Sequence, residues 1–167
     1  MEYIIIADPL YRIVKFPKDF KKIIDHPYLQ RLKWIRQLGG VSFVYPSANH
    51  TRFEHSLGTG YLAGIIAENL GLEKEKYILA GMLHDIGHGP FSHSTEFVLY
   101  KISGIKHEDI SIEKIREMKD IISELGYDHG EIIDEIRGKT GIISGTLDAD
   151  RLDYLERDAY FTGNFVG

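Results

Sequence analysis

Several histidine and aspartate residues of this sequence stand where they could meet around a divalent metal ion. His84 and Asp85 are adjacent, and a glycine-rich stretch follows them. An ion that must hold phosphate oxygens and activate water suits a mixture of imidazole and carboxylate ligands with open coordination positions. Two histidines and two aspartates would supply that mixture. Further candidates lie on both sides of the pair: His55 before it, and His88, His93, Asp148 and Asp150 after it.

The adjacent pair poses a geometric problem, because consecutive side chains on a helix point about 100° apart. His84 and Asp85 can therefore bind one ion only near a helix end or at a corner where helices pack. The glycines at positions 87 and 89 provide such an end. A His-Asp dipeptide alone is a weak signal, so the prediction depends on the whole set of residues. The absence of cysteine excludes thiolate ligands and disulfide bonds.

The elements that must position these residues are mostly helical. Apolar residues recur at spacings of three and four from residue 17 onward, which is typical of amphipathic helices. Two β-prone runs, residues 3–6 and 12–16, flank an Asp-Pro turn signal and predict a hairpin within residues 1–16. The expected helices cover about residues 20–24, 28–37, 53–70, 73–85, 92–101, 108–119, 121–125, 129–137 and 150–160.

Composition limits the class of protein. The chain has 167 residues, 43% hydrophobic and 27% charged, which predicts one globular domain over residues 1–167. A net charge of −5 argues against a binder of double-stranded nucleic acid, which would normally carry a basic surplus. The N-terminal stretch does not have the pattern of a signal peptide, and no apolar run is long enough to span a bilayer, so we expect a cytoplasmic protein without a membrane partner. The chain is expected to be either a compact minimal version or a piece of something longer.

Four stretches occur in an order that resembles a known family. They are IIDHPYLQRLKWIRQLGG (23–40), HTRFEHSLGTGYLAG (50–64), LAGMLHDIGHGPFSH (79–93) and LDADRLDYLERD (147–158). Together they are similar to the HD-domain deoxynucleoside triphosphate triphosphohydrolases, which include bacterial dGTPase-like enzymes and the eukaryotic SAM-and-HD-domain dNTPase. The resemblance covers about residues 8–163. It implies a mainly α, HD-domain helical bundle with a small N-terminal β-hairpin, and a metal-dependent phosphohydrolase.

The resemblance also assigns the metal ligands. By matching motifs, His55 of RFEHS, the pair His84 and Asp85, and Asp150 of DADRLDY would hold the ion. These ligand types accept Mn, Fe, Co, Ni, Zn or Mg, so the sequence does not name the metal.

Substrate contacts follow from the same motifs. The resemblance places the guanidinium groups of Arg52 and Arg151 toward the phosphates of a nucleotide, where an arginine pairs well with phosphate oxygens. It places Gln37 and Leu38 against the sugar. Tyr154 and Asp158 would share a helix face with Asp150 and also contact the sugar, while Asp153 and Arg157 would form an ion pair on the outward face.

The remaining histidines divide into two groups. The resemblance places His88 and His93 on the phosphate side and makes His107 the proton donor to the leaving oxygen, oriented by the carboxylate of Glu96. No chemistry is assigned to His26, His50 or His129, which we expect at the surface, with a structural role as the alternative for His50 because it precedes the site arginine.

One motif departs from the family pattern. The usual DPIHG near the N-terminus is DPLYR here, so a histidine and a glycine are missing. Three functions therefore stay open: hydrolysis of (deoxy)nucleoside triphosphates to nucleoside and tripolyphosphate, a nucleotidase or phosphodiesterase acting on monophosphates or cyclic nucleotides, and a non-catalytic metal- or nucleotide-binding sensor. The family also allows a homo-oligomer.

Overall fold

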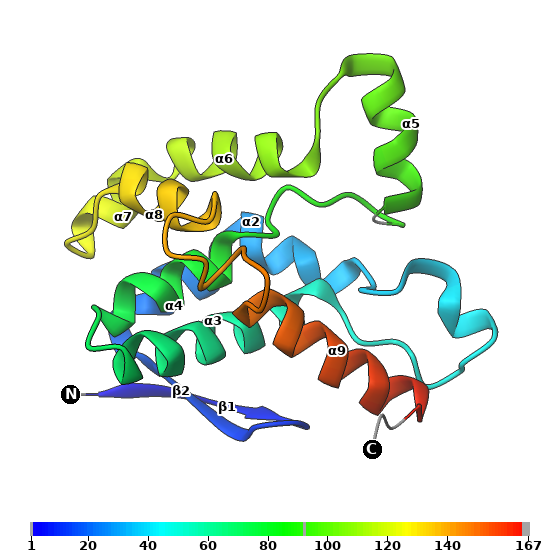
Figure 1. Ribbon diagram of the computed structural model, residues 1–167, viewed down its shortest axis with the longest axis horizontal. Helices are drawn as coiled ribbons and strands as arrows, with labels where there is room; N and C mark the ends of the chain where they lie inside the picture. Colours follow the sequence, from blue (N-terminus) through cyan, green and yellow to red (C-terminus); the bar gives the residue numbers. More distant parts are fainter. Residues whose placement is uncertain (1, 92, 165–167) are drawn as a thin grey trace.

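Helices form most of the structure, and the predicted fold class is confirmed. The computed structural model describes residues 2–91 and 93–164, without the side chains of residues 93 and 94. Within this part of the chain, β1 (Tyr3–Asp8) and β2 (Arg12–Pro17) form an antiparallel hairpin (Figure 1). The helices are α1 (Lys21–Ile24), α2 (Pro27–Gln30), α3 (Arg52–Asn69), α4 (Lys74–Leu83), α5 (His93–Ser103), α6 (His107–Glu117), α7 (Lys119–Glu124), α8 (His129–Ile136) and α9 (Ala149–Thr162), and short 3-10 helices occupy Lys18–Phe20, Arg31–Trp34 and Gly39–Phe43.

The pair α3 and α4 forms the centre of the fold. The carboxylate of Glu54 accepts a hydrogen bond from the backbone N–H of Thr51, which satisfies a donor at the start of α3. Along its length α3 packs against α4, and it also contacts α9 and β2. Leu57 of α3 and Leu79 and Leu83 of α4 are buried between these elements. The two helices bearing the RFEHS and HD motifs are thus held rigidly side by side.

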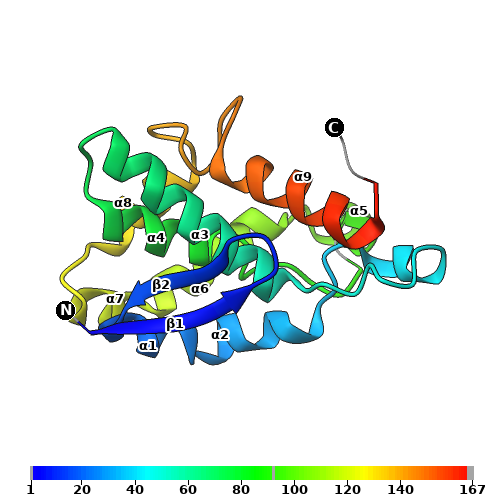
Figure 2. The same cartoon turned by 90° about the horizontal axis from the view of Figure 1, so that it is seen from below.

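The N-terminal hairpin covers one side of α3. Residues alternate along β2, so Val14 and Phe16 are buried in the core whereas Ile13 is exposed. Asp8 pairs with Arg12 at the turn end of the ladder. Figures 1 and 2 show the hairpin beneath α3, with its turn next to α9. The hairpin therefore contacts α3 through β2 and α9 through its turn.

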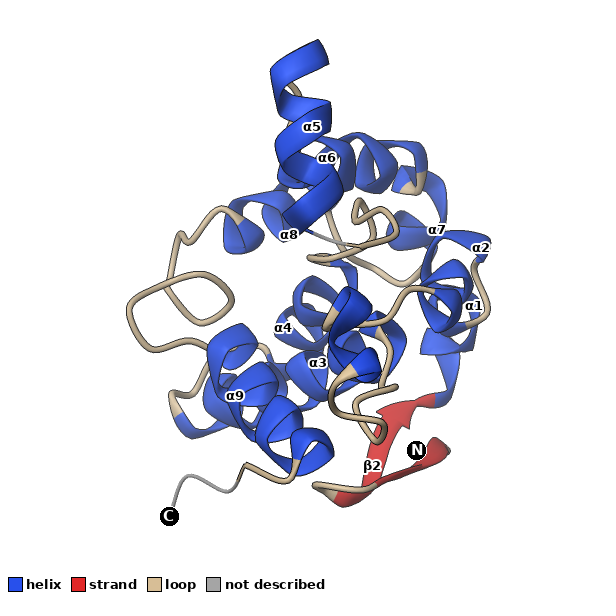
Figure 3. Cartoon of the chain, turned by 90° about the vertical axis from the view of Figure 1, so that its right-hand side faces the viewer, coloured by secondary structure: helices blue, strands red, loops and turns tan. Residues whose placement is uncertain are grey.

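A second group of helices, α6, α7 and α8, covers the opposite side of α4. Helix α8 packs against both α4 and α6, and Ile115, Ile122 and Ile132 are buried among them. Helix α5 extends away from the rest of the molecule (Figures 1 and 3), and its Ile102 is 82% exposed. In the described ranges, no helix is long and apolar enough to cross a membrane.

Two predicted helix boundaries are wrong. The helix expected over residues 28–37 ends at Gln30, passes through a 3-10 turn and becomes extended at Ile35. There the Gln37 N–H donates to the carbonyl of His50, and the Arg52 N–H donates to the carbonyl of Ile35. Pairing with the segment that enters α3 therefore outweighs the local helical pattern.

The helix predicted for residues 73–85 is also too long. Helix α4 ends at Leu83, and tight turns follow in which the N–H of Ile86 bonds to the Leu83 carbonyl and the N–H of His88 to the Asp85 carbonyl. His84 and Asp85 consequently sit at a helix end.

Candidate metal centre and its cavity

Three helix ends bring the predicted metal ligands to one place. His55 lies in the first turn of α3, His84 directly follows the last residue of α4, and Asp150 lies in the first turn of α9. Helix α9 starts at this point because the carboxylate of Asp148 caps it, accepting from the backbone N–H of Arg151 at 2.7 Å. Asp148 is therefore a capping residue.

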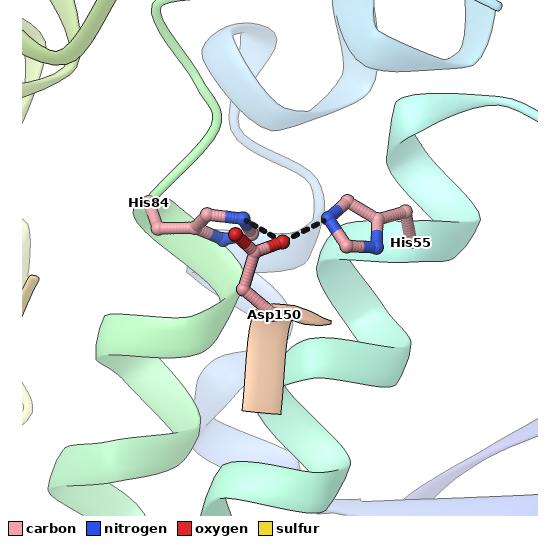
Figure 4. A group of neighbouring side chains, drawn as sticks. All are labelled: His55, His84 and Asp150. Carbon is pink, nitrogen blue, oxygen red and sulfur yellow. Dashed lines mark ion pairs between the residues drawn. The ribbon is translucent and has the colours of Figure 1, made fainter. Parts of the chain in front are cut away.

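The side chains of His55, His84 and Asp150 converge (Figure 4). The Nε2 atom of His55 is 3.0 Å from Oδ1 of Asp150, and the Nε2 atom of His84 is 3.5 Å from the same oxygen. Both histidines are buried, whereas Asp150 is partly exposed. One carboxylate oxygen thus lies between two imidazole nitrogens at the edge of the core.

Each imidazole is oriented by a hydrogen bond from its other nitrogen. The Nδ1–H of His55 donates to Oδ2 of Asp153 at 2.8 Å, and the Nδ1–H of His84 donates to the carbonyl of Gly81 at 2.7 Å. These bonds fix the tautomer in which Nε2 carries a lone pair, as in histidines that bind metals. The two lone pairs then face the same point.

Asp85 lies beside this group and is held by an arginine. Its Oδ2 is paired with the guanidinium of Arg52, while Oδ1 is 3.4 Å from Nε2 of His84 and 3.3 Å from Nε2 of His88. Oδ2 is 3.7 Å from Nε2 of His55. The fourth predicted ligand therefore contacts both histidines of the group, but it stands outside the cluster of His55, His84 and Asp150 and is grouped instead with His88 and His107.

The donor set fits a divalent ion. Ligand atoms bound to one ion at about 2.1 Å lie roughly 3.0–3.4 Å apart, close to the contacts of 3.0 to 3.7 Å between these side chains. The buried Nε2 of His84 makes no hydrogen bond to any described residue, and an unsatisfied buried nitrogen is costly unless a ligand completes it. Nitrogen and oxygen donors without sulfur are compatible with all six candidate metals.

The electrostatics of the cluster also favour a cation. Burial alone would lower the pKa of His55, but hydrogen bonds with Asp150 and Asp153 raise it to about 10. Burial likewise opposes the charged form of His84, yet the negative charges of Asp85 and Asp150 raise its pKa. Without an ion, protons on the imidazoles would offset the carboxylates, so binding of a metal would release them.

A cavity of about 490 Å³ opens onto the cluster. It collects residues from five separate parts of the chain, including all six that the sequence predicts as substrate contacts. It also contains Glu108, which sequence reasoning missed. The lining is formed by Gln37, Leu38, Arg52, His55, Asp85, His88, His107, Glu108, Asp150, Arg151, Tyr154 and Asp158.

His107 reaches the cavity because α6 begins directly above the loop that follows Asp85. A Cβ at Gly87 would lie 2.2 Å from the carbonyl oxygen of His107, so only glycine permits this approach. The carboxylate of Glu96 accepts from Nδ1–H of His107 at 2.5 Å. The ring of His107 stacks on that of His88 with a centroid distance of 3.7 Å. The structure thus brings these three predicted residues together.

The pKa of His88 is strongly lowered. Burial, together with the positive charges of Arg52 and His107, lowers its pKa to about 4 despite the nearby Asp85. It is therefore neutral at neutral pH and can act as a hydrogen-bond partner for an anion only through a ring N–H. The predicted role of His93 concerns a side chain outside the described residues.

Two predicted substrate contacts already have protein partners. The exposed Arg151 donates from Nη1 to the carbonyl of Thr146 at 2.5 Å. The carboxylate of Asp158 is 2.7 Å from Nε2 of His50, whose ring stacks on Phe161. His50 is only 2% exposed, so the surface position is wrong and the alternative of a structural role agrees with the structure. No pattern in the sequence distinguishes it from a surface histidine, because its partners are about a hundred residues away.

Asp153 and Arg157 form the predicted ion pair, but its predicted outward position is wrong. Both side chains are completely buried, and Arg157 donates from Nε and Nη2 to the two oxygens of Asp153 at 2.9 Å each. An i, i+4 pair looks the same in sequence whether it faces solvent or core. Helix α9 packs on α3 with this face because Asp153 bonds to His55.

Comparisons with known proteins agree with this geometry. The HD domain family matches residues 52–158. An uncharacterized protein of Methanocaldococcus jannaschii is 43% identical over 98% of this chain, and a deoxynucleoside triphosphate triphosphohydrolase SAMHD1 homolog of Dictyostelium discoideum is 33% identical over 95%. The crystal structure of a phosphohydrolase from Bacteroides thetaiotaomicron is 40% identical over 97% of this chain, with a TM-score of 0.81.

These relatives are longer than the chain. It spans 35% of the M. jannaschii protein, 36% of the D. discoideum protein and 43% of the B. thetaiotaomicron chain. The matched family region runs from Arg52, at the start of α3, to Asp158 on α9, and so contains His55, His84, Asp85 and Asp150. The chain belongs to the HD domain family.

Proposed function

We propose that this protein is a metal-dependent phosphohydrolase that cleaves (deoxy)nucleoside triphosphates to nucleoside and tripolyphosphate. The observation that carries the proposal is the cavity whose lining holds His55, Asp85 and Asp150 together with two arginines. His84 contacts Asp85 and Asp150 of this lining. A bound cation and arginine donors together suit negatively charged phosphates. The name of the D. discoideum relative, a deoxynucleoside triphosphate triphosphohydrolase homolog, supports the triphosphate as substrate.

His55, His84, Asp85 and Asp150 would hold the divalent ion. When bound, such an ion supplies Lewis acidity that polarises a phosphate oxygen and lowers the pKa of water. Arg52 is positioned by its pairing with Asp85, and its positive charge would offset negative charge on the phosphate chain. Arg151, on the exposed rim of the cavity, adds a second positive charge.

The leaving group requires a proton donor. A water molecule attacks the α-phosphorus, the bond from phosphorus to the 5′ oxygen breaks, and the 5′ oxygen takes a proton from Nε2 of His107. Glu96 holds Nδ1–H of His107, and Nε2 lies 4.0 Å from Glu108 in the cavity lining. A positioned acid of this kind accelerates a reaction by about 10²–10⁴.

In this proposal the sugar lies against four residues of the cavity lining, Gln37, Leu38, Tyr154 and Asp158. The carboxylate of Asp158 and the amide of Gln37 offer acceptors and donors for a ribose hydroxyl, while the Tyr154 ring offers an apolar face. His50 keeps Asp158 in place through its 2.7 Å contact. These groups favour a nucleoside over a small phosphoester.

The proposal is tested by incubating the purified protein with Mn²⁺, Co²⁺, Ni²⁺, Zn²⁺, Fe²⁺ or Mg²⁺ and a panel of nucleotides. We expect tripolyphosphate and free nucleoside from at least one triphosphate. Turnover of only monophosphates or cyclic nucleotides would replace the proposal by a nucleotidase or phosphodiesterase. Metal binding without release of any phosphate species would instead indicate a sensor.

A further inference from the structure

A buried carboxylate lies behind the metal centre and is completely occupied by donors. Asp153 is 0% exposed, and its Oδ2 accepts from Nδ1–H of His55 at 2.8 Å. Its Oδ1 accepts from the hydroxyl of Tyr11, also at 2.8 Å. Arg157 donates to both oxygens at 2.9 Å. Four hydrogen-bond donors, from α3, from α9 and from the turn of the hairpin, thus meet on the carboxylate of Asp153.

The network continues into the N-terminal hairpin. Nη2 of Arg157 is 3.0 Å from Oδ2 of Asp8, the last residue of β1. The other oxygen of Asp8 accepts the backbone N–H groups of Leu10 and Tyr11, which shapes the hairpin turn. The turn that lies next to α9 in Figures 1 and 2 is therefore bonded, through Arg157 and Asp153, to His55.

The fold leaves room for this network at one glycine. A Cβ at Gly58 would lie 1.9 Å from Oδ1 of Asp153 and 2.4 Å from Nη2 of Arg157. Gly58 is on α3, one turn after His55. Helices α3 and α9 approach closely enough for Asp153 to reach the imidazole only because no side chain stands there.

Stability alone is a poor explanation for this arrangement. A buried ion pair loses so much hydration that apolar residues of similar size often replace it without loss. Asp153, however, also bonds to the ring nitrogen of His55 opposite the one that faces Asp150. A carboxylate in this position fixes the imidazole and makes its second nitrogen a stronger metal ligand.

We propose that Asp153 is the positioning residue for the metal ligand His55, and that the N-terminal hairpin is a working part of the metal centre. Tyr11 acts on Asp153 directly, and Asp8 acts through Arg157. This inference rests on the metal site of the proposed function. It makes metal affinity sensitive to residues of the hairpin, which lies outside the matched family region.

The test compares Co²⁺ binding by the wild-type protein with binding by Asp153→Asn and Tyr11→Phe. Affinity is measured by competition with a chelating dye, and the visible absorption of bound Co²⁺ reports the ligand geometry. The matched control is Tyr77→Phe, because the Tyr77 hydroxyl also donates to a buried carboxylate, that of Glu135, at 3.2 Å. Unfolding temperatures in chelator monitor the fold of each variant.

We expect Asp153→Asn to weaken Co²⁺ binding roughly 10- to 100-fold and Tyr11→Phe roughly 2- to 10-fold. Both variants should alter the absorption spectrum, and Tyr77→Phe should change neither property. If Asp153→Asn does not fold, the Tyr11→Phe result decides the matter.

If Asp153→Asn and Tyr11→Phe both keep the wild-type affinity for Co²⁺ and the wild-type absorption spectrum, the inference is overturned and the proposed function is unaffected. Failure of the wild-type protein to bind Co²⁺ would overturn both. A third outcome separates the two claims: the wild-type protein binds Co²⁺, both variants bind it more weakly as expected, and no nucleotide is turned over. That outcome would support the inference and reject the phosphohydrolase proposal.

Discussion

The imidazoles of His55 and His84 are oriented by different acceptors. His55 donates to a carboxylate, whereas His84 donates to the backbone carbonyl of Gly81. A carboxylate partner raises the basicity of a ligating imidazole more than a neutral carbonyl does. The two nitrogens that face Asp150 are therefore unequal ligands, with His55 the stronger.

The acceptor of the His107 imidazole should matter in the same way, because we propose His107 as the proton donor. Replacing Glu96 by Gln would remove the negative charge next to His107 but keep the shape of the side chain. We expect kcat to fall roughly 10- to 100-fold while metal content is unchanged, because a neutral amide stabilises a protonated imidazole less than a carboxylate does. Steady-state kinetics and elemental analysis of the same preparation check this expectation.

Glu113→Gln is the matched control, since Glu113 is an exposed carboxylate on α6, the helix that His107 begins. It should leave kcat unchanged. Equal kcat in the wild-type and Glu96→Gln proteins would show that the short contact to His107 has no catalytic role.

The sequence predicts which residues meet at the cluster, but it does not predict which residues form hydrogen bonds with them. His55, His84, Asp85 and Asp150 are recognisable because motifs keep them in order along the chain. Asp153 and His50 are not, since their roles depend on contacts across 98 and 108 residues. Which face of α9 points inward is decided by packing against α3, and no charge pattern reveals it.

At the level of elements, the largest departure from prediction is the segment between α2 and α3. Local spacing favours a helix through residue 37, but the backbone of residues 35–37 pairs with residues 50–52. This pairing brings Gln37 and Leu38 to the mouth of the cavity, next to Arg52. A continued helix would have carried them elsewhere, so tertiary pairing overrides local propensity here.

The cap of helix α2 predicts how the stability of the fold depends on pH. Its first turn is capped by His26, whose Nδ1 accepts the backbone N–H of Tyr28 at 3.2 Å. Burial and the positive charge of Lys114 lower the pKa of His26 from its ordinary value of 6.5. The folded state thus favours neutral His26, and this stabilisation is complete above about pH 6.5 and lost as pH falls through the folded-state pKa.

We therefore expect the unfolding temperature to drop more steeply between pH 7 and pH 5 in the wild-type protein than in His26→Asn, since asparagine caps a helix without titrating. Circular dichroism melts at several pH values measure the difference. Parallel curves for the two proteins would show that the cap does not contribute to acid sensitivity.

At the scale of the whole molecule, an acidic chain with a net charge of −5 encloses a cavity of mixed charge. The lining contains the guanidinium groups of Arg52 and Arg151 and also four carboxylates, those of Asp85, Glu108, Asp150 and Asp158. A bound divalent ion would offset the carboxylates and leave the arginines available to an anion. The overall helical fold was predictable because its apolar periodicity is strong, whereas the cavity residues come from five distant segments and were recognisable only through the family motifs.

Metal removal should lower global stability, because the ligands come from α3, α9 and the turn after α4. An ion present at 100 times its Kd stabilises the folded state by about 2.7 kcal/mol. For a chain of this size that corresponds to a loss of roughly 5–10 °C in Tm on chelation. Differential scanning calorimetry with and without chelator measures it, and Asp150→Asn should show no comparable change.

The most direct test of the metal-dependent phosphohydrolase combines metal content with product release in wild-type and Asp150→Asn protein. We predict close to one tightly bound divalent ion per wild-type chain and release of tripolyphosphate from a nucleoside triphosphate. In Asp150→Asn both should be lost, the activity by at least roughly 100-fold. Wild-type rates in Asp150→Asn, or in protein stripped of metal, would contradict the account.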